Sequence, residues 1–415
     1  MTLGRFTRRH PAALAIASAV AIVVLTLGWR FTRDEPSAAT GIRLSAQALG
    51  PWSAQLQLTV PPDATSVQIA RNGRMIDRFP AAAANHSLTY TDHLLWPGTG
   101  YDYEADALDG GGTVRSRARA ATTTVAAGQD IARFYAPSSF WNQAIAANPT
   151  TDDKSAEFVQ HSLVADAATA NLANTDQWGI ALVYANTADR NYVVGCRRYG
   201  CQSSVSFRFP ALSRPTTGSD HHLTVIDPSG ERELDMWLAV HDRLADRWAA
   251  GSRYVIATTG GGGACAVGTR CGSAVASGFA EMGGIIRPEE IAQGHIDHAL
   301  FITVPRARMD LVACPASGTD GTDNDPSAIP EGAQIQLDPA FDVESQPWPR
   351  WEKIIARAFQ VYGGYVGDTG GSLAVRAEAT LNRGYEAWSQ AGTPSGPSLT
   401  ALPWHRFRVL DISTC

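Results

Sequence analysis

The sequence predicts a mainly β protein. Many short stretches alternate apolar with polar side chains, which is the period of a strand with one buried face. Turn residues separate them, since the 415 residues include 38 glycines and 23 prolines. Two segments show the longer period of a helix. For the larger, C-terminal part we expect a β-sandwich of jelly-roll kind with two covering helices, and an α+β fold is the alternative.

Composition and charge indicate a globular protein that exceeds one ordinary domain. Hydrophobic residues make up 44% of the chain and charged residues 18%, as in proteins with a sizeable core. The formal net charge is −6. Because this balance gives no broad basic surface, we expect no nucleic-acid partner.

The N-terminus predicts export. Residues 11–29 are apolar and can just span a bilayer. Three arginines precede them and place the N-terminus in the cytoplasm: Arg5, Arg8 and Arg9. We favour an uncleaved anchor in the cytoplasmic membrane over residues 1–30, because no small-x-small cleavage site ends the apolar core. A cleaved signal peptide is the alternative. After a polar linker at 31–40, the chain would lie outside the cytoplasmic membrane, anchored or secreted.

The six cysteines agree with export. Their spacing lacks the tighter Cys-x-x-Cys or Cys-x-x-His pattern of a zinc site, so structural disulfides are the better interpretation. Connectivity does not follow from sequence alone. The candidate pairs are Cys196–Cys201, Cys265–Cys271 and Cys314–Cys415.

Residues 41–124 predict a small β domain. The dipeptide Asn72-Gly73 is typical of a tight hairpin turn. The segment from Leu95 through Pro97-Gly98-Thr99 to Tyr101 resembles the part of fibronectin type III domains that carries the buried tyrosine corner. The resemblance implies a small β-sandwich that serves as a spacer beside another domain. The expected strands cover residues 54–60, 66–71, 75–79, 87–91, 101–108 and 113–121.

Residues 131–415 form the second expected domain, and its strands are separated by turn residues. Helices are expected at 154–172 and 351–362, where apolar residues recur at helical spacing. A single helical turn is expected between Pro288 and Gly294. The expected strands are 180–184, 205–209, 223–227, 233–239, 254–258, 299–304, 334–337 and 407–412.

The most informative segment is the expected hairpin formed by residues 219–227 and 231–238. Alternation places His222 and Thr224 on one face of the first strand, and apolar side chains on the other. The polar face of the second strand carries Glu233, Asp235 and Trp237. A two-residue loop would pair His222 with Asp235, and a four-residue loop would pair it with Trp237. The polar face is either solvent-facing surface or the floor of a site.

This face carries residue types suited to a carbohydrate. Glu233 and Asp235 are two apart, so their carboxyls lie roughly 6–7 Å apart, which does not decide between retaining and inverting hydrolysis. Thr224 shares the face and would contact substrate. Asp368 either approaches the same cleft from a loop or caps a turn.

A second dense stretch runs from Arg287 to Leu300. It contains His295, Asp297 and His298 as three metal-ligand types, but on a strand His298 would not share a face with the other two. His298 is either a hydrogen-bonded structural residue or a substrate contact. We expect no metal and no cofactor.

Three blocks of the larger domain resemble a group of uncharacterised secreted proteins. The resemblance spans most of residues 131–410 and implies a polysaccharide-associated extracellular protein, without an established activity to carry over. The blocks are residues 134–142, 220–228 and 294–300, and a matching C-terminal section runs from 340–342 through a helix to Asp368.

Together these residues predict an extracytoplasmic protein that hydrolyses a cell-envelope or environmental polysaccharide. In this hypothesis Asp235 and Glu233 are the acid and the base. His222 and His298 orient the substrate, and Trp237 stacks on a sugar ring. The alternatives are a non-catalytic glycan-binding or adhesion protein and a polysaccharide lyase in which His222 is the base.

Overall fold

The computed structural model describes the chain between residues 41 and 412, with short gaps. The predicted anchor at 11–29 lies outside the described part, as do Cys265, Cys271 and Cys415. No helix of the described part is long and apolar enough to cross a bilayer. The described ranges are 41–81, 86–199, 201, 203–263 and 273–412.

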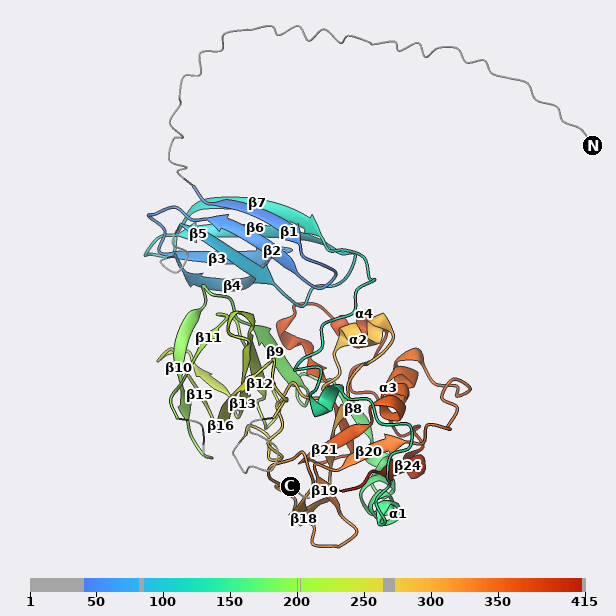
Figure 1. Ribbon diagram of the computed structural model, residues 1–415. Helices are drawn as coiled ribbons and strands as arrows, with labels where there is room; N and C mark the ends of the chain where they lie inside the picture. Colours follow the sequence, from blue (N-terminus) through green and yellow to red (C-terminus); the bar gives the residue numbers. More distant parts are fainter. Residues whose placement is uncertain (1–40, 82–85, 200, 202, 264–272, 413–415) are drawn as a thin grey trace, which may run out of the picture. The chain divides into compact units, whose positions relative to one another are not determined.

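The first strands form a small sandwich of two antiparallel sheets (Figure 1). One sheet has the order β1-β2-β5 and the other β4-β3-β6-β7. The six strands predicted in this region are confirmed, while β1 was missed because its small and polar residues give a weak alternation. The strands are β1 (Arg43–Ala48), β2 (Ala54–Thr59), β3 (Ser66–Arg71), β4 (Arg74–Pro80), β5 (Ser87–Asp92), β6 (Gly100–Leu108) and β7 (Val114–Thr123).

Two local predictions for this sandwich are confirmed. Asn72 and Gly73 both have positive φ, 50° and 76°, in the tight turn between β3 and β4, as a two-residue hairpin requires. The Tyr101 hydroxyl accepts a hydrogen bond of 2.8 Å from the backbone N–H of Trp96. This is the tyrosine corner that the resemblance to fibronectin type III domains implied.

Replacing Tyr101 by phenylalanine is expected to destabilise the sandwich by about 1 kcal/mol, because one hydrogen bond at a largely buried corner is lost. Thermal unfolding of the full chain would show this as a lower transition midpoint. Tyr199→Phe, at a tyrosine that is 61% exposed, is the control and should leave the transition unchanged. Equal transitions for the two variants would contradict this role of Tyr101.

The remaining strands make the protein mainly β, as predicted. They form sheets in the orders β11-β10-β15-β14, β16-β13-β12-β9-β23, β24-β20-β21-β17-β22-β8 and β18-β19. Some neighbours are parallel, including β9 with β12 and β17 with β21, whereas a jelly roll is built from antiparallel strands. The larger part of the chain is therefore mainly β, but its sheets contain both parallel and antiparallel pairs of strands.

The bounds of these strands match the predicted ranges closely where a strand was expected. The strands are β8 (Asn171–Ala173), β9 (Ile180–Tyr184), β10 (Arg190–Cys196), β11 (Val205–Phe209), β12 (Leu223–Asp227), β13 (Arg232–Trp237), β14 (Val240–Asp242), β15 (Arg247–Ala250), β16 (Ser252–Ala257), β17 (Leu300–Val304), β18 (Ala307–Val312), β19 (Ile329–Glu331), β20 (Gln334–Leu337), β21 (Gly364–Thr369), β22 (Ala374–Arg376), β23 (Glu378–Ala379) and β24 (Phe407–Val409).

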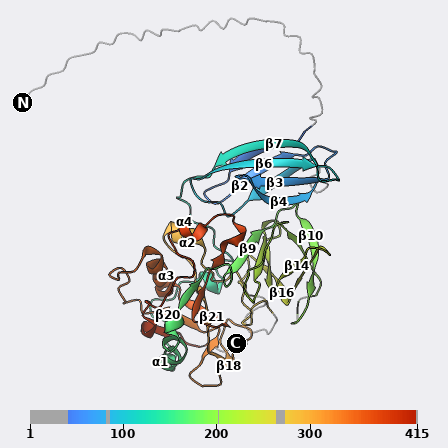
Figure 2. The same ribbon diagram turned by 180° about the vertical axis from the view of Figure 1, so that it is seen from behind.

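Helices are few and short in the described part. The predicted helix at 351–362 is α3, and both views show it beside β20 and β21 (Figures 1 and 2). Its apolar stripe packs into one core with the six-stranded sheet. The α-helices are α1 (Ser155–Phe158), α2 (Pro288–Gln293), α3 (Arg350–Val361) and α4 (Ala387–Gln390). A π-helix covers Val159–Val164, and 3₁₀ turns cover Phe140–Asn142, Ala167–Thr169, Pro228–Gly230, Thr380–Asn382 and Trp404–Arg406.

The other predicted helix, at 154–172, is interrupted. It consists of α1, the π-helix and a 3₁₀ turn, and its last residues form β8. Leu172, within the expected helix, pairs with Val375 of β22 in the six-stranded sheet. Tertiary pairing thus overrides the helical periodicity at this end.

The disulfide predictions are confirmed where the structure describes both residues. Cys196 and Cys201 are bonded, with an S–S distance of 2.07 Å. Cys314 is also disulfide-bonded. The predicted partner of Cys314, Cys415, and the predicted pair Cys265–Cys271 lie outside the described residues.

Candidate functional site

The predicted hairpin forms, with the four-residue loop. Asp227 pairs with Arg232, and Thr224 lies opposite Asp235. Continued by one more pair, this register places Trp237, and not Asp235, opposite His222. Every side chain of β12 and the four inner side chains of β13 are buried, so both faces of the hairpin are covered. The interpretation of the polar face as open, solvent-facing surface is therefore wrong.

The buried polar face carries an internal hydrogen-bond network. Thr224 donates to Asp235 Oδ1 at 3.0 Å, and the backbone N–H of Glu281 donates to Oδ2 of the same carboxyl at 2.9 Å. The hydroxyl of Tyr135 donates to Glu233 Oε1 at 2.8 Å. Glu233, Asp235 and Glu281 are each 0% exposed, so none of the three reaches solvent.

Burial decides the protonation of these carboxyls. Desolvation, together with the charge of Glu281, raises the pKa of Asp235 to about 8. Desolvation and the charge of Asp235 raise the pKa of Glu233 well above its ordinary value. Asp235 is therefore largely protonated at neutral pH. The same burial favours the protonated form of Glu233, because a charged carboxylate in this interior would be costly.

Glu281 is the buried carboxylate that faces the imidazole of His222 and the guanidinium of Arg376. His222 Nδ1 lies 2.7 Å from Glu281 Oε1. Arg376 donates to Oε2 at 3.2 Å. Burial alone would raise the pKa of Glu281, but the nearby His222 and Arg376 outweigh it and the pKa is lowered. Glu281 thus holds His222 and Arg376 in place as a charged partner.

His222 and Arg376 form part of the wall of a pocket of about 550 Å³. His222 directly precedes β12, Arg376 ends β22, and Asp368 comes from β21. The indole of Trp178, just before β9, is 51% exposed at this pocket. The lining residues are Asn171, Leu172, Ala173, Thr175, Gln177, Trp178, Asp220, His222, Thr303, Asp368, Thr369, Gly370, Gly371, Ser372, Ala374, Arg376 and Gly396.

Asp368 is the carboxyl in this pocket whose protonation changes near neutral pH. Arg376 donates a hydrogen bond to Asp368. Burial raises the pKa of Asp368 to about 7, although Arg376 opposes the rise and Asp320 adds to it. A carboxyl with a pKa near the working pH is suited to proton transfer.

The structure places the predicted site residues in three groups. His222 and Asp368 line the pocket. Thr224, Asp235 and Glu233 lie behind it, in the buried network. Two further predicted site residues do not line this pocket, Trp237 and His298.

Trp237 lies directly behind Asp220 of the pocket wall. Its indole N–H donates to Asp220 Oδ1 at 3.4 Å, and its ring lies 5.5 Å from that of Tyr199. His298 is buried elsewhere, where Nε2 lies 3.0 Å from Glu290 Oε1 and Nδ1 lies 2.9 Å from the carbonyl of Ala299. These partners occupy both nitrogens of His298, so the structural interpretation fits it.

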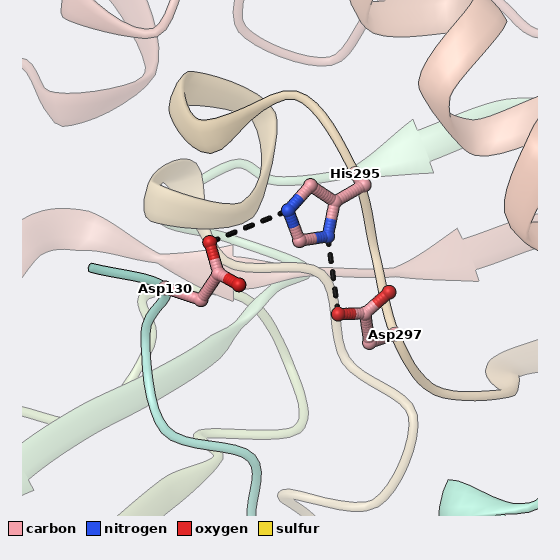
Figure 3. A group of neighbouring side chains, drawn as sticks. All are labelled: Asp130, His295 and Asp297. Carbon is pink, nitrogen blue, oxygen red and sulfur yellow. Dashed lines mark ion pairs between the residues drawn. The ribbon is translucent and has the colours of Figure 1, made fainter. Parts of the chain in front are cut away.

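His295, Asp297 and Asp130 form a more exposed group, which Figure 3 shows. Asp130 lies 3.3 Å from Nε2 of His295, and Asp297 lies 3.1 Å from Nδ1. Each ring nitrogen therefore faces a different carboxylate. As expected from the alternation, His298 does not join them.

A second group of carboxyls lies beside the pocket. One oxygen each of Asp320, Glu331 and Asp368 lies within 4.8 Å of the others. Burial and the neighbouring Asp320 raise the pKa of Glu331 to about 10. A proton held by Glu331 thus accounts for the close approach of these acids at neutral pH.

Stability should fall as pH rises from about 4 to about 8, because Asp235 binds its proton more tightly in the folded protein. Between its unfolded pKa and its folded value of about 8, the folded state holds a proton that the unfolded state has released. Asp235→Asn should flatten this slope. Denaturant unfolding across this pH range measures it. The control Asp153→Asn, at an exposed carboxyl, should keep the wild-type slope, and an unchanged slope in Asp235→Asn would contradict the assignment.

Sequence reasoning missed Glu281 and Arg376. Glu281 lies in a loop with neither strand nor helix periodicity, and Arg376 lies in a three-residue strand. Neither residue lies near a recognised motif, and both are far from His222 in the sequence.

Comparison with known proteins gives no family. No family model and no curated protein matches the chain. Among solved structures, fibronectin(III)-like modules of Clostridium thermocellum CbhA match with 13% identity over 21% of this chain and 99% of that chain, with a TM-score of 0.18. A Family 28 exopolygalacturonase of Yersinia enterocolitica matches with 17% identity over 22% of this chain and 21% of that chain, TM-score 0.19. A pectate lyase of Pectobacterium carotovorum matches with 17% identity over 26% of this chain and 32% of that chain, with a TM-score of 0.18.

Proposed function

We propose that this protein is an extracytoplasmic enzyme that hydrolyses a polysaccharide in the pocket lined by His222 and Asp368. The supporting observation is that one pocket joins a histidine, a carboxyl with a pKa of about 7 and an exposed indole. An aromatic face stacks on a sugar ring, while the two titratable groups exchange protons.

In this proposal the acid is Asp368, and not Asp235 or Glu233, which the sequence-based hypothesis took as acid and base. Asp368 lines the pocket, whereas the other two are 0% exposed. Protonated Asp368 gives its proton to the leaving oxygen as the glycosidic C–O bond breaks. Water adds to the anomeric carbon and gives a proton to His222.

Glu281 supports His222 as a positioning residue. With Nδ1 of His222 2.7 Å from Glu281, Nε2 is the nitrogen left to take the proton from water. The charge of Glu281 also stabilises the imidazolium that forms in this step, as a buried acid does for other catalytic histidines. Asp235 contacts the backbone of Glu281 and thereby fixes this partner.

Release of reducing ends tests the proposal. The full chain, with its disulfides intact, is incubated with cell-envelope and environmental polysaccharides. Hydrolysis would release reducing ends without new ultraviolet absorbance. Release accompanied by absorbance of an unsaturated sugar would indicate a lyase, and binding without release would indicate a glycan-binding protein. Either result would overturn hydrolysis.

A further inference from the structure

A second pocket, of about 460 Å³, lies next to the first and is strongly basic. Four arginines and two histidines line it, and no aspartate or glutamate does. The whole chain has 34 basic residues, counted as lysine plus arginine, against 40 acidic ones, so this lining is unlike the average surface. The basic residues are Arg197, Arg198, Arg214, Arg243, His221 and His241.

Three of these arginines are available for a ligand. Arg197, Arg198 and Arg243 are exposed, and within the described part of the chain their guanidinium groups make no hydrogen bond and no ion pair. Asp242 does not line the pocket, and its pKa is lowered by a hydrogen bond from the backbone of Ala245 and by the charges of Arg247 and Arg197. The acid that pairs with a lining residue is Asp246, 3.2 Å from Nε2 of His241, and it leaves the three guanidinium groups unpaired.

The basic pocket adjoins the pocket of the proposed active site through one segment. Asp220 and His222 line the first pocket, and His221 between them lines the basic one. Nδ1 of His221 lies 2.9 Å from the carbonyl of Thr216. A carbonyl only accepts, so Nδ1 carries the proton there and Nε2 remains free of this bond.

An aromatic pair lies between the two pockets. Trp237 donates to Asp220 of the first pocket, and a Cβ atom added to Gly251 of the basic pocket would lie 3.0 Å from the Trp237 ring. Tyr199, 61% exposed, packs against this indole. Such a pair offers a stacking surface for a sugar between the two pockets.

We propose that the basic pocket binds carboxylate groups of the polysaccharide that is cleaved next to it, so that the substrate is a uronic-acid-containing polysaccharide. This inference rests on the proposed function and names its substrate class. A guanidinium group is always charged and its planar fork matches a carboxylate. The sugar between the pockets would stack on Trp237 and Tyr199.

Binding of a defined uronic acid oligosaccharide to the full chain tests this proposal. The triple variant Arg197→Gln, Arg198→Gln, Arg243→Gln should bind it about 100-fold more weakly, as expected for several lost charge-assisted contacts. Binding of the same oligosaccharide with its carboxyls reduced to alcohols should be weak for wild type and variant alike. A control with the same charge change at exposed arginines of the small sandwich, Arg43→Gln, Arg78→Gln, Arg119→Gln, should bind as wild type does.

The outcomes separate this inference from the proposed hydrolysis. Arginine-dependent binding of the acidic oligosaccharide without cleavage would support the pocket and overturn hydrolysis. Equal binding by wild type and triple variant, or preference for the neutral oligosaccharide, would overturn the pocket even where cleavage persists. Tighter binding of a single-stranded oligonucleotide than of the uronic acid oligosaccharide would also overturn it.

Discussion

Asp368→Asn is expected to lower polysaccharide hydrolysis by about 10²- to 10⁴-fold, because an amide cannot give up the proton that the leaving oxygen needs. The substitution keeps the size of the side chain and an acceptor for Arg376, which donates to Asp368 in the native protein. Folding should therefore be retained. Initial rates of reducing-end release at saturating substrate measure the effect.

Two comparisons make this result specific. Asp153→Asn removes an exposed carboxyl outside the pocket and should keep the wild-type rate. His222→Ala should also be slow, whereas His405→Ala, at an exposed histidine, should not. Wild-type activity in Asp368→Asn would show that Asp368 is not the acid.

The largest effect on stability is expected for Arg383→Met. Arg383 is 0% exposed through its side chain and donates to the carboxylates of Glu289 and Glu378, which are themselves buried. Removing the guanidinium leaves two buried carboxylates without their cation, which costs about 3–5 kcal/mol. The free energy of unfolding in denaturant measures this loss.

A surface pair gives the matched control for this substitution. Arg357 pairs with Glu344, and their side chains are 45% and 64% exposed, so Arg357→Met should cost less than about 1 kcal/mol. Adding Glu289→Gln and Glu378→Gln to Arg383→Met should recover part of the loss, because the unpaired charges are then gone. A loss in Arg383→Met as small as in Arg357→Met would contradict the stabilising role.

Local features of the fold were predictable from the sequence. Asn72-Gly73 gave a hairpin because its residues tolerate positive φ, and the alternation in Leu223–Asp227 and Arg232–Trp237 placed two strands with a short loop between them. Each of these predictions depends on neighbours in the chain. The helix expected at 154–172 failed in part because Leu172 finds a sheet partner two hundred residues away, at Val375.

The candidate site depended on contacts that no local pattern encodes. The polar face of the hairpin was correctly grouped, but alternation gives only the side of a strand and not what covers that side. Glu281 comes from a loop, and its backbone closes over Asp235 while its carboxylate faces His222. The sequence therefore indicated His222 and Asp368 as candidates. The pairing of β17 with β21 and β22 brings Asp368 and Arg376 together, and Glu281 links Arg376 to His222.

The pH dependence of kcat/KM tests the central claim, that Asp368 and His222 act as acid and base in one pocket. The acid must be protonated, and burial raises the pKa of Asp368 to about 7. We therefore predict that kcat/KM falls about tenfold per pH unit above about pH 7, and that the fall is absent from the residual rate of Asp368→Asn. A wild-type kcat/KM that stays level or rises between pH 7 and 9 would contradict the account.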